Sequence, residues 1–150
     1  MTDSFRIDRI LGARPFAEVG EPSLAIDDEN RRVIAVAGAY VAKTGTDHFP
    51  RIAPVAVYGT DDLACRALLY ARYPVHAMAF HPTLPLLAVG AGDYDGGYFF
   101  EGELLLLDLE TGSTTSLIEH WSGRQVLGLQ WLSGPNRTIF GSVTFGGLGR

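Results

Sequence analysis

The side chains best suited to hold a metal ion lie in the acidic, glycine-rich stretch 93–103. Its carboxylates are Asp93, Asp95, Glu101 and Glu103. They alternate with other residues as calcium ligands do. The twelve-residue calcium loop, however, needs an oxygen ligand at its fifth position and glycine at its sixth, and this stretch has Gly97 and Tyr98 there. We therefore interpret this stretch as an acidic turn, and we expect neither a metal ion nor a cofactor.

The other reactive side chains form no catalytic pattern. The four histidines are His48, His76, His81 and His120. None of them is paired at the spacing of a metal-binding helix or a zinc finger. Cys65 is the only cysteine, has no histidine near it in sequence, and is interpreted as a buried structural thiol. Lys43 precedes Gly45, whereas a phosphate-binding loop has lysine after the glycine. The sequence thus favours a protein without catalytic activity.

Aromatic and arginine side chains concentrate in segments 40–53 and 93–102 and in the connections after residues 71 and 120. These residue types are enriched at the hot spots of protein interfaces. The candidate partner-binding residues are Tyr40, His48, Phe49, Arg51, Tyr94, Tyr98, Phe99, Phe100, Trp121 and Arg124. In an alternative interpretation, Tyr98, Phe99 and Phe100 fold over their own strands as a hydrophobic lid. The sequence leaves both interpretations open.

These segments occupy equivalent places in a repeat with a period of about 52 residues. Each unit begins with a short apolar strand, a turn and a longer apolar strand. The predicted pairs are 23–27 with 33–39, 77–81 with 86–92, and 129–133 with 138–144. Third strands are predicted at 54–58 and 103–109, and fourth strands at 64–72 and 113–120. Segment 64–72 also has apolar residues at helical spacing, so a helix is its alternative, although the repeat favours a strand.

Four antiparallel strands per repeat are typical of a β-propeller blade. The predicted fold is therefore all-β, with antiparallel four-stranded blades and an incomplete ring, and an open β-sandwich is the alternative. The expected divisions of residues 1–150 are an outer closing strand at 5–14, blade 1 at 22–72, blade 2 at 75–120, and half of blade 3 at 125–146. Because propellers typically have about 4 to 8 blades, we expect either a longer protein or self-association that completes the ring.

Composition limits the class of partner. The chain has 150 residues, of which 47% are hydrophobic and 19% charged, as in a single globular domain. Its net charge is -5, and its basic residues are scattered, so no nucleic-acid surface is expected. No apolar run is long enough to span a membrane, and the first residues include acids and arginines where a secretory signal has an apolar core. The prediction is a cytoplasmic protein that binds no membrane.

The second unit carries a family resemblance. Residues 75–82 (VHAMAFHP), 86–92 (LLAVGAG) and 105–112 (LLLDLETG) resemble the first three strands and turns of the WD-repeat superfamily of β-propellers, with Leu107-Asp108 where that family has Trp-Asp. The resemblance implies a rigid, non-enzymatic scaffold that binds a protein or peptide, here through the loop face carrying 40–53 and 93–102. The alternative is a propeller segment of a larger hydrolase or ligand-sensing protein whose active residues lie elsewhere.

Overall fold

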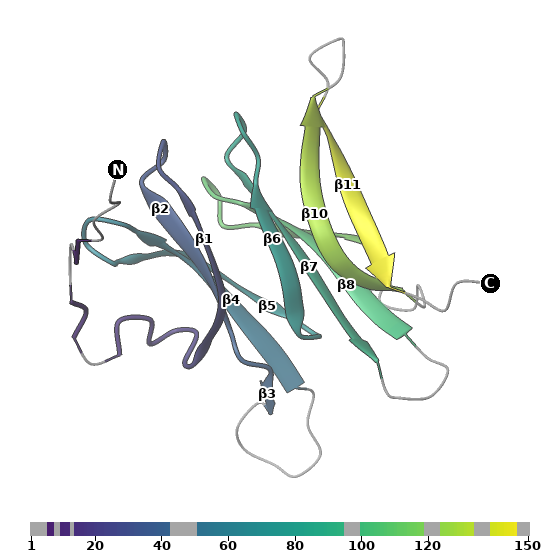
Figure 1. The fold of residues 1–150 in the computed structure, drawn as a ribbon, viewed down its shortest axis with the longest axis horizontal. Coiled ribbons are helices and arrows are strands. Elements are labelled where there is room, and N and C mark those ends of the chain that lie inside the picture. The colour runs from purple at the N-terminus through teal and green to yellow at the C-terminus, as the bar shows by residue number, and fades with distance from the viewer. Residues whose placement is uncertain are drawn as a thin grey trace.

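The computed structural model describes residues 6–7, 10–12, 14–42, 51–94, 100–118, 124–133 and 139–146. This described part of the chain is made of strands β1 to β11 joined by turns, without a helix. Its strands form three antiparallel sheets that follow one another in chain order and lie side by side (Figure 1).

The first sheet contains four antiparallel strands in the order in which they occur, with one short addition. They are β1 (Pro22–Asp28), β2 (Val33–Gly38), β4 (Arg51–Gly59) and β5 (Cys65–Ala71). The two-residue strand β3 (Val41–Ala42) pairs with the start of β4. The formation of β5 decides between the two interpretations of segment 64–72: it is a strand, because pairing with β4 outweighs the local helical pattern.

The second sheet repeats this order, and the third contains two strands. The second sheet consists of β6 (Val75–Phe80), β7 (Leu86–Tyr94), β8 (Phe100–Asp108) and β9 (Thr114–Ile118). Within the described residues the third sheet is the pair β10 (Gln125–Ser133) and β11 (Ile139–Gly146). The prediction of an all-β fold with antiparallel four-stranded sheets is confirmed.

The main core lies between the first and second sheets. Along a strand, alternate side chains point to opposite faces, and the apolar residues follow that period. Val55 and Val57 of β4 join one buried cluster with Leu87 of β7 and with Leu105 and Leu107 of β8. These side chains are at most 4% exposed, and full burial of each such side chain contributes roughly 1.5–3 kcal/mol.

The third sheet contacts the second at closer range because glycines line the contact. A Cβ atom added to Gly102 would lie 1.9 Å from the carbonyl oxygen of Arg124, and one added to Gly90 would lie 2.4 Å from Cγ1 of Val126. Val126 is fully buried. The missing Cβ atoms thus let the start of β10 lie almost directly on β7 and β8.

The other face of the first sheet is covered by the residues before β1. Phe16 packs against the ring of Tyr58 at 5.1 Å between ring centroids, and the Tyr58 hydroxyl donates a hydrogen bond to Oε2 of Glu18 at 2.9 Å. The outer strand expected at 5–14 has no counterpart in the described residues of that segment, which are 6, 7, 10–12 and 14.

Candidate functional site

The sheets have two ends, and each end gathers a different set of side chains. The insertion end carries the described residues of segments 40–53 and 93–102 together with the connection 72–74. The turn end carries the tight turns 29–32, 60–64, 81–85 and 109–113. Figure 1 shows the β1–β2 and β6–β7 turns together at the top and β3 at the bottom.

The insertions prove to be extensions of hairpins. Pairing between β7 and β8 continues through Asp93 with Glu101 to Tyr94 with Phe100. In the first sheet, Val41 pairs with Ile52 in the same way. The connecting segments that remain are 43–50 and 95–99, which lie outside the described residues. The predicted binding residues outside the described part are His48, Phe49, Tyr98, Phe99 and Trp121.

Two predicted residues, Tyr94 and Phe100, form a stacked aromatic pair at the end of the β7–β8 hairpin. Their ring centroids are 4.5 Å apart and their planes differ by 10°. Phe100 is half-buried, whereas Tyr94 is 45% exposed. An aromatic pair of this kind contributes roughly 0.5–1.5 kcal/mol beyond the area it buries. The hairpin therefore holds an exposed tyrosine ring in one orientation.

Two further predicted residues meet on the first sheet. The guanidinium carbon of Arg51 lies 5.9 Å from the centroid of the Tyr40 ring, within range of a cation–π contact. Burial, and then the charge of Asp93, raises the pKa of Tyr40, while Arg51 opposes the shift. The phenol of Tyr40 thus stays protonated near neutral pH and is close enough to the second sheet to sense its carboxylates.

The connection between the first and second sheets is fixed to this end by acidic side chains. Glu103 is 7% exposed, and its Oε2 accepts a hydrogen bond from the backbone nitrogen of Arg72 at 3.0 Å. Burial, followed by the charge of Glu101 and a hydrogen bond to it, raises the pKa of Tyr73 to about 12. Arg124, another predicted residue, is exposed, and its backbone lies against Gly102. The described residues of the insertion end are therefore held in a fixed arrangement.

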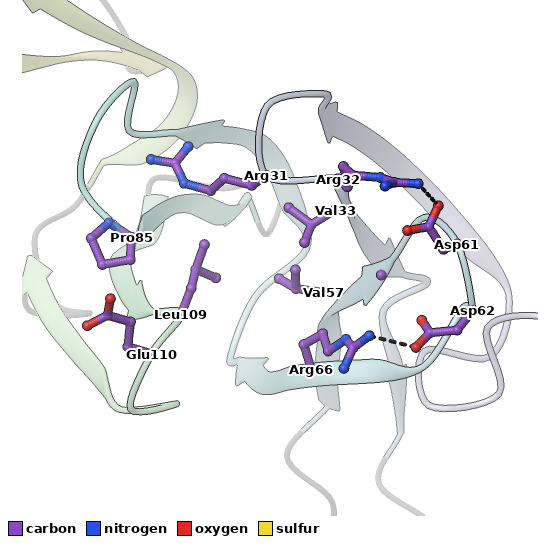
Figure 2. Close-up of a pocket in the computed structure, with 11 residues that line it drawn as sticks. Arg31, Arg32, Val33, Val57, Asp61, Asp62, Arg66, Pro85, Leu109 and Glu110 are labelled. Carbon is purple, nitrogen blue, oxygen red and sulfur yellow. Dashed lines mark hydrogen bonds and ion pairs between the residues drawn. The ribbon is translucent and has the colours of Figure 1, made fainter.

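The turn end contains a cavity of about 440 Å³ that the sequence did not predict (Figure 2). The lining residues that carry charge are Arg31, Arg32, Asp61, Asp62, Arg66 and Glu110. Val33 and Val57 lie between the charged groups contributed by the two sheets. Arg32 pairs with Asp61, and Arg66 with Asp62 at 2.6 Å. Its sequence signals are the Arg31-Arg32 and Asp61-Asp62 doublets, which come from separate turns.

The charged groups of this cavity are held by neighbouring groups. Among its described lining residues, the carboxylates of Asp61, Asp62 and Glu110 are the side chains that can accept a proton. Arg31 is held by Asp28 and donates from Nη2 to the carbonyl oxygen of Leu84 at 2.7 Å. A hydrogen bond from the backbone nitrogen of Ala64 is the main cause that lowers the pKa of Asp62. The cavity is thus a charge-balanced hollow with an apolar floor.

Cys65 is exposed, so the prediction of a buried thiol is wrong. The register of β4 and β5 shifts between Val57 and Tyr58, where Val57 pairs with Ala67 but Tyr58 pairs with Cys65. This bulge takes Cys65 out of the buried row that continues through Ala67 and Leu69. Partial burial, and then the charge of Glu18, still raises the pKa of the thiol and disfavours the reactive thiolate.

Among the described residues, no group of three or more His, Cys, Asp and Glu side chains could hold a metal ion. In the same part of the chain, no helix has the length and apolar character needed to cross a membrane. No family model, curated protein or solved structure matches the sequence significantly. The functional interpretation is therefore based on the geometry of the chain itself.

Proposed function

We propose that this chain is a non-enzymatic cytoplasmic scaffold of β-propeller type that binds a protein or peptide through its insertion end. The observation that carries this proposal is the stacked pair of Tyr94 and Phe100, with Tyr94 45% exposed in the last described pair of the β7–β8 hairpin. A tyrosine held in one rotamer loses little conformational entropy when a partner covers it. Such a ring provides both apolar area and a hydroxyl for a hydrogen bond.

The surroundings of the pair support a protein or peptide as the ligand. Tyr40 and Arg51 add an amphipathic aromatic ring and a guanidinium group. Tyrosine and arginine are the residue types most enriched at interface hot spots. The chain has a net charge of -5 and no basic cluster, which argues against nucleic acid as the partner. A second copy of the chain that extends the row of sheets is one possible protein partner.

The test is a selection of random peptides displayed on phage against the wild-type chain. The selected peptides are then measured against Tyr94→Ser combined with Phe100→Ser, and against Tyr70→Ser. Tyr70 is a matched control because it is an exposed tyrosine, 55% accessible, that lies on the outer strand β5 of the first sheet and not on the β7–β8 hairpin. We expect the double variant to weaken binding at least about tenfold, equivalent to ~1.4 kcal/mol, and the control to leave it unchanged.

Two results would count against this function. Equal affinity for the double variant and the wild type would remove the insertion end as the binding site. A large fall in melting temperature in the double variant would instead support the lid interpretation of the aromatic residues. The alternative of a ligand-sensing segment would gain support if an acidic small molecule raised the melting temperature of both proteins equally through the turn-end cavity.

A further inference from the structure

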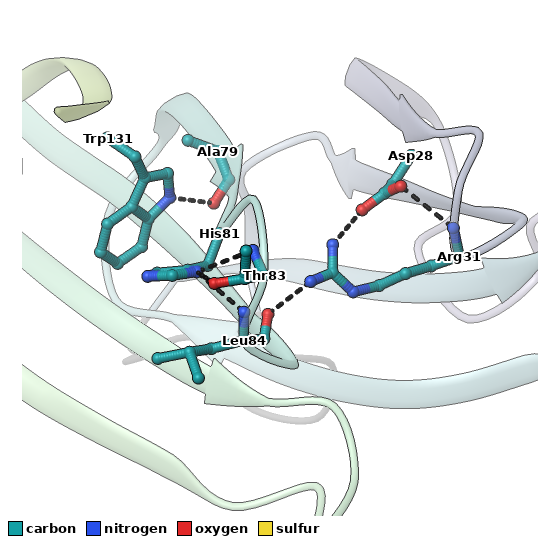
Figure 3. Close-up of polar contacts among 7 residues, drawn as sticks. All are labelled: Asp28, Arg31, Ala79, His81, Thr83, Leu84 and Trp131. Carbon is teal, nitrogen blue, oxygen red and sulfur yellow. Dashed lines mark hydrogen bonds and ion pairs between the residues drawn. The ribbon is translucent and has the colours of Figure 1, made fainter. Parts of the chain in front are cut away.

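His81 lies at the first position of the turn between β6 and β7 and is 4% exposed. Its Nδ1 atom accepts hydrogen bonds from the backbone nitrogens of Thr83 at 3.1 Å and Leu84 at 2.9 Å (Figure 3). An imidazole nitrogen that accepts a hydrogen bond cannot carry a proton, so the proton of neutral His81 is on Nε2. The turn is therefore closed by one particular protonation state.

This turn is also the point at which all three sheets are joined. From the third sheet, the indole of Trp131 packs edge-on against His81 with 4.5 Å between ring centroids, and its Nε1 donates to the carbonyl oxygen of Ala79 at 3.1 Å. From the first sheet, Arg31 donates to the carbonyl oxygen of Leu84 at 2.7 Å. Figure 3 shows these contacts converging on the turn from both sides.

The groups facing His81 make a positive charge there unfavourable. The charged groups among the described neighbours are Arg31 and, paired with it, Asp28 from the β1–β2 turn. Thr83 on the same turn and Trp131 on β10 are neutral. Burial, and then the positive charge of Arg31, lowers the pKa of His81. A proton on Nδ1 would also oppose the two backbone N–H groups that now point at it.

We propose that His81 controls a pH-dependent conformational change. Protonation of its Nδ1 atom opens the 81–85 turn and weakens the packing of the third sheet on the second. Opening removes the acceptor for the backbone nitrogens of Thr83 and Leu84. It also displaces the Leu84 carbonyl oxygen that Arg31 binds and the ring against which Trp131 packs. The two-stranded third sheet is the element most affected, because it meets the second sheet mainly through β10.

The direction of the pH effect follows from linkage. In the open turn His81 has an ordinary pKa near 6.5, and in the closed turn the pKa is lower. The closed turn therefore has its full stability above pH of about 6.5 and loses it as the pH falls toward the lower value. The open form binds more protons, so acid favours it.

The equivalent position in the first sheet provides an internal comparison. Asp28 is the last residue of β1, and His81 directly follows β6. The Oδ1 atom of Asp28 accepts a hydrogen bond from the backbone nitrogen of Arg31 at 3.1 Å. This turn thus closes on a carboxylate oxygen that does not titrate near pH 6. His81→Asn places an amide oxygen at the same acceptor position without a titrating group, so it should keep the turn closed.

The experiment is hydrogen–deuterium exchange, corrected for intrinsic rates, on the full chain and on two variants. In the wild type we expect exchange in 125–133 to rise at least about fivefold between pH of about 7.5 and about 5.5, with little change in β2 and β4. His81→Asn should abolish this rise. His76→Gln should retain it, because His76 is an exposed histidine on the neighbouring strand.

The proposal is overturned if His81→Asn keeps the acid-induced rise, or if β2 and β4 in the wild type exchange as much as β10. A measurement on the wild type alone covers the case in which the variant does not fold. Histidine ¹⁵N spectra should show Nδ1 of His81 unprotonated at neutral pH and a titration midpoint below the ordinary histidine value of about 6.5. A protonated Nδ1 at neutral pH, or an ordinary midpoint, would also overturn the proposal.

Discussion

The first and second sheets contain the same reverse turn built from different residues. In the first, the backbone nitrogen of Gly59 donates to the carbonyl oxygen of Ala64, and the backbone nitrogen of Leu63 donates to the carbonyl oxygen of Gly59. In the second, the backbone nitrogens of Asp108 and Gly112 donate in the same pattern to the carbonyl oxygens of Ser113 and Asp108. The second residue before the next strand has a positive φ in both turns, 55° at Leu63 and 72° at Gly112. Backbone hydrogen bonds thus define this turn, and a leucine tolerates the conformation that suits glycine.

The first and second sheets also differ in the surface that packs against the next sheet along the chain. Ala37 and Ala53 of the first sheet are fully buried alanines. The corresponding positions of the second sheet are Gly90 and Gly102, against which β10 packs at a distance that excludes a Cβ atom. The first contact is therefore filled by side chains, and the second depends on close approach of backbones. The second contact should tolerate substitution less well.

Gly102→Ala gives the largest expected effect. The new methyl group would lie 1.9 Å from the carbonyl oxygen of Arg124, and a backbone atom cannot yield as the end of a side chain can. We expect the free energy of unfolding to fall by about 2–3 kcal/mol through displacement of the third sheet, as measured by urea denaturation.

The matched control for this substitution is Ala53→Gly in the first sheet. It removes one buried methyl group and adds backbone freedom, so its cost should be about 1 kcal/mol. If both substitutions lower the free energy of unfolding equally, the contact between the second and third sheets would not depend on close backbone approach more than the contact between the first and second.

Alanine and glycine variants at Leu63 and Gly112 should change the free energy of unfolding by an intermediate amount. At Leu63 and at Gly112 the positive φ disfavours any side chain, by roughly 1–2 kcal/mol for an L-residue. We therefore expect Leu63→Gly to be more stable than Leu63→Ala, and the wild type to be more stable than Gly112→Ala, by about 1 kcal/mol in each case in thermal or urea unfolding. Alanine more stable than glycine at either position would mean that the residue does not adopt this conformation in solution.

The strands could be predicted from sequence because their apolar alternation and turn residues are local signals. The strand at 65–71 needed the comparison between repeats, since its own pattern also fits a helix. The exposure of Cys65 could not be predicted, because the bulge that causes it depends on register with β4. The extension of β7 to Tyr94 was missed because the residues there have no apolar pattern. The strand continues only through backbone pairing with β8.

The candidate sites differ in the same way. Tyr94 and Phe100 were predicted together because they lie close in sequence on one hairpin. The turn-end cavity was missed because its walls come from turns that are far apart in the chain and meet only when the sheets pack. The role of His81 was also missed. Its sequence indicates a turn residue, but only the fold places Arg31 and Trp131 beside that turn.

Arg66→Gln gives the smallest expected effect and separates the backbone from the ion pair as the source of stability in the first turn. Arg66 and Asp62 are 55% and 49% exposed, and water and salt screen an ion pair at that exposure. Arg66 is the extra residue of the bulge in β5, whereas Thr114 and Thr115 of the second sheet pair with Leu107 and Leu106 without a bulge between them, and that turn forms without such an ion pair. We therefore expect a change in the urea midpoint too small to resolve, both at low and at high salt. A clear loss at low salt that disappears at high salt would show that the pair holds the turn, and the two turns would then differ in mechanism as well as in sequence.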